Sequence, residues 1–168
     1  MANMAIEAGA KAGLFAADAK TRDYVRARGR DDGLYLHSDP DAGYSNVYEF
    51  DVTGFEPFIA VPFIPENVKP ISELNGLQIN QVVIGMCTNG NLEDLRAAAE
   101  ILRGRKIHPR VRAVIIPGTQ KVYLDALREG LIEIFIEADC SVSTPTCGPC
   151  LGGHMGVPLI QHLEDRSP

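Results

Sequence analysis

Hydrophobic residues follow two alternating periodicities in the second half of the chain. Short apolar runs at residues 79–85, 111–117 and 140–144 are typical of buried strands. Residues 91–105 and 119–130 instead repeat their apolar positions at the spacing of a helix, and the segment 131–139 fits either a helix or a strand. This alternation predicts right-handed βαβ units, and therefore an α/β fold with a mainly parallel sheet flanked by helices in three layers.

The pattern before residue 79 is less regular. An alanine-rich repeat near residues 4–12 and a second repeat at 18–28, ended by Gly29, predict two helices. Apolar and polar residues alternate at 47–52, and a short apolar run follows at 58–62, so both segments are expected to be strands. A proline-containing connector at 62–74 then leads into the regular region.

Composition excludes several classes of protein. The 168 residues carry a net charge of −6, which gives no electrostatic footprint for nucleic acid. No apolar run reaches the roughly 18–20 residues that cross a bilayer, and the first residues do not resemble a secretory signal. We therefore expect a cytoplasmic protein with no membrane partner. Four cysteines in a reducing compartment indicate metal binding or catalysis rather than disulfides.

Three of the cysteines lie just beyond predicted strands. Cys87 follows the strand at 79–85, and Cys147 and Cys150 follow the strand near 140–144. Ligands of open α/β sheets gather at the carboxyl ends of strands, so these two distant segments are expected to converge there. Glycines surround all three cysteines, whereas Cys140 lies within an apolar strand pattern and is expected to be buried.

Three kinds of chemistry suit these cysteines. A redox pair is disfavoured because the residues after Cys150 include three glycines within five positions, a poor start for the required helix. A structural zinc site needs a fourth ligand, which His154 or Cys140 would supply. An iron–sulfur cluster with one iron lacking a cysteine needs only three and leaves an open coordination position.

Two motifs then identify a family. The motifs Gly-x-Cys-Thr-Asn-Gly around Cys87 and Cys-Gly-Pro-Cys-x-Gly-Gly from Cys147, with the sequence between them, resemble the aconitase superfamily. Within it, the chain is most similar to the large subunits of 3-isopropylmalate dehydratases, with the homoaconitases next. The resemblance covers residues 2–157 and implies a [4Fe–4S] cluster bound by Cys87, Cys147 and Cys150. Met86 stands where that family usually has a small residue.

The resemblance also implies an activity and a partner. The family catalyses a hydro-lyase isomerisation, here of 2-isopropylmalate and 3-isopropylmalate in leucine biosynthesis, as a heterodimer with a small subunit. Its substrates are small hydroxy-dicarboxylates, and homoaconitase or dimethylmalate dehydratase activity is the alternative. Family large subunits are more than twice as long, so the chain is expected to be a truncated fragment with no activity of its own.

We expect the chain to divide into a partial domain and connector at 1–70, a cluster-bearing α/β unit at 71–157 and a tail at 158–168. The tail does not resemble the family, which suggests a frameshift. Among other polar residues, Asn89 and Thr88 are candidates to contact the cluster, and His154 is a candidate to donate to sulfur or substrate. His108 is expected to have a solvated or capping role.

Overall fold

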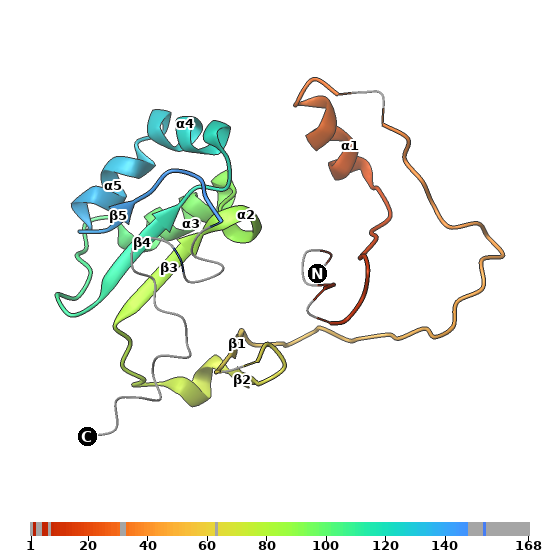
Figure 1. The fold of residues 1–168 in the computed structure, drawn as a ribbon, viewed down its shortest axis with the longest axis horizontal. Helices are drawn as coiled ribbons and strands as arrows, with labels where there is room; N and C mark the ends of the chain where they lie inside the picture. Colours follow the sequence, from red (N-terminus) through yellow and green to blue (C-terminus); the bar gives the residue numbers. More distant parts are fainter. Residues whose placement is uncertain are drawn as a thin grey trace. The chain divides into compact units, whose positions relative to one another are not determined.

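The computed structural model describes residues 2, 5–6, 8–30, 33–62, 64–147 and 153 (Figure 1). The chain divides into two compact units, Met1–Pro57 and Phe58–Pro168. Among the described residues, no helix combines the length and apolar character needed to cross a bilayer.

The first unit contains helix α1 (Ala19–Arg26). Asp18 begins this helix because its carboxylate accepts a hydrogen bond from the N–H of Thr21 at 2.8 Å. The predicted end at Gly29 is confirmed, since Gly29 has a φ of +73° and its N–H donates to the carbonyl of Arg26 at 2.9 Å.

Two elements predicted in the first unit are wrong. The described residues around 4–12 form turns rather than a helix, because Gly9 has a φ of +75°, which a right-handed helix cannot contain. The segment 47–52 forms no strand, and all its side chains are exposed. An alternating pattern specifies a strand only where one face is buried against another element, and that condition is not met here.

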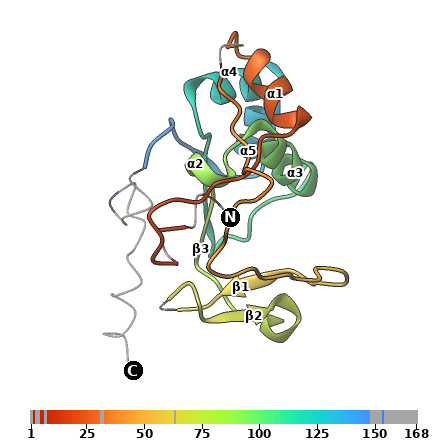
Figure 2. The ribbon, with the colours of Figure 1, turned by 90° about the vertical axis from the view of Figure 1, so that its right-hand side faces the viewer.

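The second unit starts with a small antiparallel hairpin. Strand β1 (Phe58–Ala60) confirms the predicted strand and pairs with β2 (Val68–Pro70), with Ile59 opposite Lys69. A 3-10 turn, η2 (Ile71–Leu74), follows. Figure 2 shows this hairpin near the amino-terminal end of strand β3, with helix α2 (Met86–Asn89) at the other end of that strand.

A parallel three-stranded sheet forms the centre of the second unit. Its strands are β3 (Gln81–Gly85), β4 (Arg112–Ile116) and β5 (Ser141–Val142), and β4 lies between the other two. Gly85 is opposite Ile116, and Val142 is opposite Ile115. The sheet confirms the predicted α/β fold and all three strands expected after residue 79. The carboxyl ends of β3 and β5 therefore lie at the same end of the sheet, with β4 between them.

Three helices cover one face of this sheet. Helices α3 (Leu92–Leu102), α4 (Gln120–Arg128) and α5 (Leu131–Glu137) pack against one another and against alternate residues of β4. The ambiguous segment 131–139 is thus a helix over most of its length, because its apolar residues pack between α3, α4 and β5. The fully buried side chains of this core are Leu95, Ala99, Ile115, Ala126, Phe135 and Ala138.

Candidate functional site

The structure places two of the three predicted cluster ligands beyond strands of the same sheet. Cys87 lies in α2, directly after β3, and Cys147 lies five residues after the end of β5. Both side chains are exposed. Because β3 and β5 flank β4 in parallel, their carboxyl ends lie at the same end of the sheet, and the convergence of the two cysteine-bearing segments there stays a prediction. Cys150 lies outside the described residues, so its place as a ligand stays a prediction.

The turn that carries Cys87 has an unusual backbone. Gly85 has a φ of +122° and Met86 a φ of +68°, so two successive residues have positive φ before the cysteine. A Cβ atom on Gly85 would collide with the carbonyl oxygen of Ile116, so only glycine fits there. Met86 is one of two non-glycine residues with positive φ in the described part of the chain. Its conformation costs free energy, which the surrounding packing must offset.

The far end of this turn is fastened to the end of β4. The N–H of Gly118 donates to the carbonyl of Gly90 at 2.8 Å. A Cβ atom on Gly90 would lie 2.7 Å from the nitrogen of Gly118 and 2.8 Å from the carbonyl oxygen of Ile116. Such contacts are too short for any side chain, so the turn holds its place only because Gly90 lets the two backbones approach.

Between the two buried glycines, the turn exposes three polar side chains. Cys87, Thr88 and Asn89 are exposed, while Gly85 and Gly90 are buried. The sulfur of Cys87 lies 3.7 Å from the hydroxyl oxygen of Thr88. Helix α3 begins directly after this turn at the predicted cap, where the N–H of Asn91 donates to the Asp94 carboxylate at 3.0 Å. Three successive residues therefore expose a thiol, a hydroxyl and an amide just beyond the carboxyl end of β3.

The chain leaves β5 along a course fixed by hydrogen bonds. The N–H of Ser143 donates to the carbonyl of Ile115 at 2.9 Å, continuing the pairing of β5 with β4. The buried Ser143 hydroxyl donates to the carbonyl of Thr144 at 3.2 Å. These contacts fix the chain as it leaves the carboxyl end of β5 toward Cys147. Cys87 follows the carboxyl end of β3, at the same end of the sheet.

Cys140 has a different environment from the other two described cysteines. It is 8% exposed and belongs to the hydrophobic core with Phe135 and Ala138, which confirms the predicted burial. Burial, and secondarily the charge of Asp139, raises the pKa of the Cys140 thiol. A neutral thiol packed in a core is a poor metal ligand, so this geometry disfavours Cys140 as the fourth ligand of a zinc site.

The donor atoms at the edge suit a soft metal centre. Cysteine thiolates are the usual ligands of iron–sulfur clusters, and the exposed thiols of Cys87 and Cys147 are two candidates for that role. In the described part of the chain, no three His, Cys, Asp or Glu side chains are grouped as a metal site. The third predicted ligand and His154 are not within that part.

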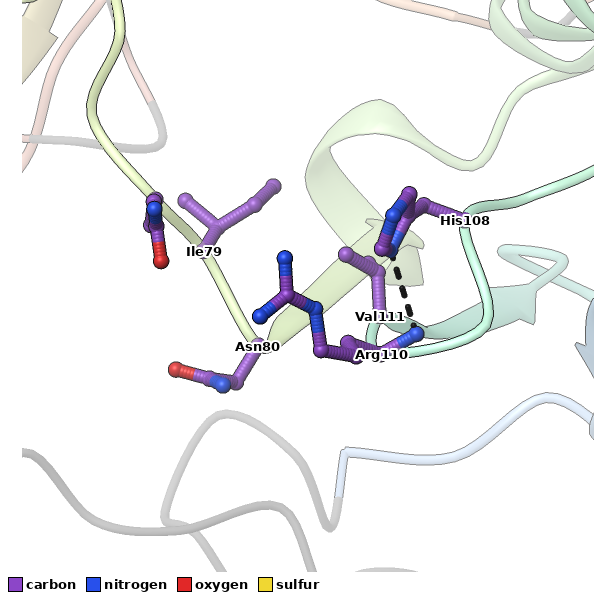
Figure 3. A pocket seen from close by; sticks show the side chains of 6 residues that line it. Ile79, Asn80, His108, Arg110 and Val111 are labelled. Atoms are coloured by element: carbon purple, nitrogen blue, oxygen red, sulfur yellow. Dashed lines mark hydrogen bonds between the residues drawn. The ribbon is translucent and has the colours of Figure 1, made fainter.

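His108 lies away from these cysteines in the loop before β4. It is exposed, and its Nδ1 accepts a hydrogen bond from the N–H of Arg110 at 3.2 Å (Figure 3). This exposed position and local hydrogen bond agree with the solvated or capping role expected for His108.

Sequence reasoning missed two features of the site. The positive φ of Met86 has no sequence signal, because methionine rarely adopts it. The close approach of Gly118 to Gly90 had a weak signal in the Pro-Gly pair that follows β4.

Comparison with known proteins extends this description. The model of the aconitase family (aconitate hydratase) matches residues 1–76 and 69–162. The 3-isopropylmalate dehydratase large subunit of Moorella thermoacetica is 57% identical over 157 residues, which cover 94% of this chain. The proteins of the same name from Thermodesulfovibrio yellowstonii and Nitratidesulfovibrio vulgaris are each 58% identical over the same share of the chain. In each case the chain spans 37% of the length of the relative.

Proposed function

The chain belongs to the aconitase family, and we propose that it is the part of a 3-isopropylmalate dehydratase large subunit that holds a [4Fe–4S] cluster through Cys87, Cys147 and Cys150. The observation that carries this proposal is the 57–58% identity, over 157 residues, to three proteins of that name. The thiols of Cys87 and Cys147 are exposed and follow the carboxyl ends of two parallel strands of one sheet, which supports the choice of ligands.

The proposed reaction is the isomerisation of 2-isopropylmalate and 3-isopropylmalate by dehydration and rehydration, a hydro-lyase step of leucine biosynthesis. When bound through three cysteines, the cluster supplies an iron with an open position that acts as a Lewis acid toward a hydroxyl and a carboxylate. The substrate is a small hydroxy-dicarboxylate. Homoaconitase and dimethylmalate dehydratase are the alternative activities, and the names of the relatives favour isopropylmalate.

The chain's own residues position the thiolates in this proposal. The turn from Gly85 to Gly90 is fixed against β4, so Cys87 is held before any ligand binds. The exposed hydroxyl of Thr88 and the exposed amide of Asn89 follow this thiol in the turn and donate hydrogen bonds to sulfur or to substrate. Hydrogen bonds to the sulfurs tune the redox and acid properties of a cluster, which gives these two polar residues a defined role.

The complete enzyme is proposed to be a cytoplasmic heterodimer, because the relatives are called large subunits and a large subunit implies a small one. The aligned residues cover 37% of those relatives. We therefore assign turnover to the complete enzyme and cluster binding to this chain, which we expect to be inactive alone.

A turnover assay tests this assignment. The chain is reconstituted with iron and sulfide under anaerobic conditions and incubated with 2-isopropylmalate, homocitrate or dimethylmalate, with and without a small subunit. We expect no turnover by the reconstituted chain alone. Measurable turnover by the chain alone would overturn its assignment as an inactive part. Turnover of homocitrate but not isopropylmalate, in the presence of a small subunit, would overturn the proposed substrate.

A further inference from the structure

A pocket lies at the opposite end of the strands from Cys87. It has a volume of about 240 Å³ and is formed by the residues before β3 and by the loop before β4. Figure 3 shows the side chain of Arg110 between Ile79 and Asn80 from the first segment and His108 from its own loop. The lining residues are Gln78, Ile79, Asn80, His108, Arg110 and Val111.

Hydrogen-bond donors dominate the polar lining of this pocket. Arg110 carries a guanidinium with five N–H groups, and Asn80 and Gln78 carry amides. The Nδ1 of His108 already accepts a hydrogen bond from the N–H of Arg110, so the proton of the neutral ring is on Nε2, which is therefore another donor. None of the lining residues is acidic. The guanidinium of Arg110, with no carboxylate beside it in the lining, favours an anion over a cation.

The charge of the surrounding segment points the same way. Residues 103–112 contain Arg103, Arg105, Lys106, Arg110 and Arg112 and no acidic residue, although the whole chain has a net charge of −6. Lys106 pairs with Asp139 at 3.0 Å. The four arginine side chains form no ion pair with any residue in the described part of the chain. The segment that supplies His108, Arg110 and Val111 to the lining therefore carries four arginines that form no ion pair among the described residues.

We propose that this pocket binds the oxyanion group of a small molecule, either a carboxylate or a phosphate. The planar guanidinium of Arg110 matches both groups through paired N–H donors. The volume is below the range of about 300–1,000 Å³ typical of drug-sized ligands, which suits a small ligand better than a peptide or a nucleotide. Ile79 and Val111 supply apolar surface for a short carbon skeleton.

A titration monitored by amide NMR tests the proposal on the full chain. Inorganic phosphate and succinate are titrated separately, with sodium chloride keeping the ionic strength constant. We expect saturable shifts centred on the backbone amides of Asn80, Arg110 and Val111. Saturation by phosphate alone, by succinate alone or by both supports the site and identifies which oxyanion it takes. Shifts that do not saturate, or that spread evenly over all arginines, would overturn it.

Three variants make the titration specific. The Arg110→Gln variant removes the paired N–H donors of the guanidinium and should weaken oxyanion binding about tenfold or more. Asn80→Asp should weaken it comparably, because it places a carboxylate in the lining while leaving Arg110 intact. Arg128→Gln, on α4 and away from the pocket, is the matched control and should bind as the wild type does. Unchanged binding in both pocket variants would overturn the proposal.

Discussion

The amide of Gly118, just after β4, donates a hydrogen bond to the carbonyl of Gly90, just after α2, across 2.8 Å. This bond joins the turn that carries Cys87 to the central strand of the sheet. The contact exists because Gly90 has no side chain, and an added Cβ atom would lie 2.7 Å from the nitrogen of Gly118. The position of the candidate ligand therefore depends on a backbone contact between two glycines.

Gly90→Ala is expected to displace this turn. Its φ is −110°, which alanine adopts freely, so the cost arises from the short contacts alone and should be roughly 1–3 kcal/mol, as for other overpacked sites. Urea unfolding measures the loss of stability. Gly43→Ala is the control, because a Cβ atom there meets nothing within 4 Å. Equal unfolding midpoints for the two variants would contradict the account of the turn.

Phe135→Ala is expected to destabilise the second unit by roughly 3–5 kcal/mol, because the ring is fully buried between the helices and the sheet. Ile136→Ala removes the neighbouring side chain of the same helix, which is 59% exposed, and should have a much smaller effect. Thermal or urea unfolding compares them. If both variants unfolded alike, α5 would not pack as described.

The described cysteines should differ in reactivity. Cys87 is exposed, whereas burial raises the pKa of the Cys140 thiol and removes it from solvent. Iodoacetamide should therefore modify Cys87 rapidly and Cys140 slowly in the folded, cluster-free chain, and both rapidly in urea. Mass spectrometry of the peptides measures the two rates. Equal rates in the folded chain would show that Cys140 is accessible.

An ion pair between α3 and the end of α4 should give stability a defined pH dependence. Arg96 donates to both carboxylate oxygens of Glu129, at 2.8 and 2.7 Å. These hydrogen bonds hold the pKa of Glu129 below its usual value. The stability from the pair is therefore fully present above the unfolded pKa of about 4.3 and is lost as the pH falls through the lower folded pKa.

Arg96→Gln tests this pH dependence. The variant should be less stable than the wild type at pH 7, and the difference should shrink below pH 4, as measured by urea unfolding at each pH. Arg105→Gln removes an exposed arginine that forms no ion pair with the described residues and should show no such trend. A difference for Arg96→Gln that stayed constant down to pH 3 would argue against the pair.

The sequence predicted the second unit far better than the first. Strands β3 and β4 contain apolar runs, and β5 packs against α5, so local pattern and tertiary burial agree there. The segment 47–52 has an equally clear alternation, but none of its side chains is buried, so nothing in its surroundings fixes it as a strand.

Predictions about the candidate site differ in the same way. The placement of Cys87 and Cys147 beyond the carboxyl ends of β3 and β5, the strands on either side of β4, follows from the order of strands and helices, which can be read from the sequence. The positive φ of Met86 does not, because it results from packing of the turn against β4, a contact between residues distant in sequence. The residue types indicated the candidate chemistry. The backbone conformation of the turn that carries Cys87 was visible only in the structure.

Anaerobic reconstitution with iron and sulfide tests the central claim most directly. The wild-type chain and three variants, Cys87→Ala, Cys147→Ala and Cys140→Ala, are compared by iron and sulfide content and by electron paramagnetic resonance after reduction. Cys140→Ala is the matched control, because it removes a cysteine from the hydrophobic core rather than an exposed cysteine beyond a strand.

We expect about four irons per wild-type chain, because the proposed centre is a [4Fe–4S] cluster. Loading should be similar in Cys140→Ala and strongly reduced in Cys87→Ala and Cys147→Ala. Absence of a cluster in the wild-type chain, or unchanged loading in Cys147→Ala, would contradict the proposed site.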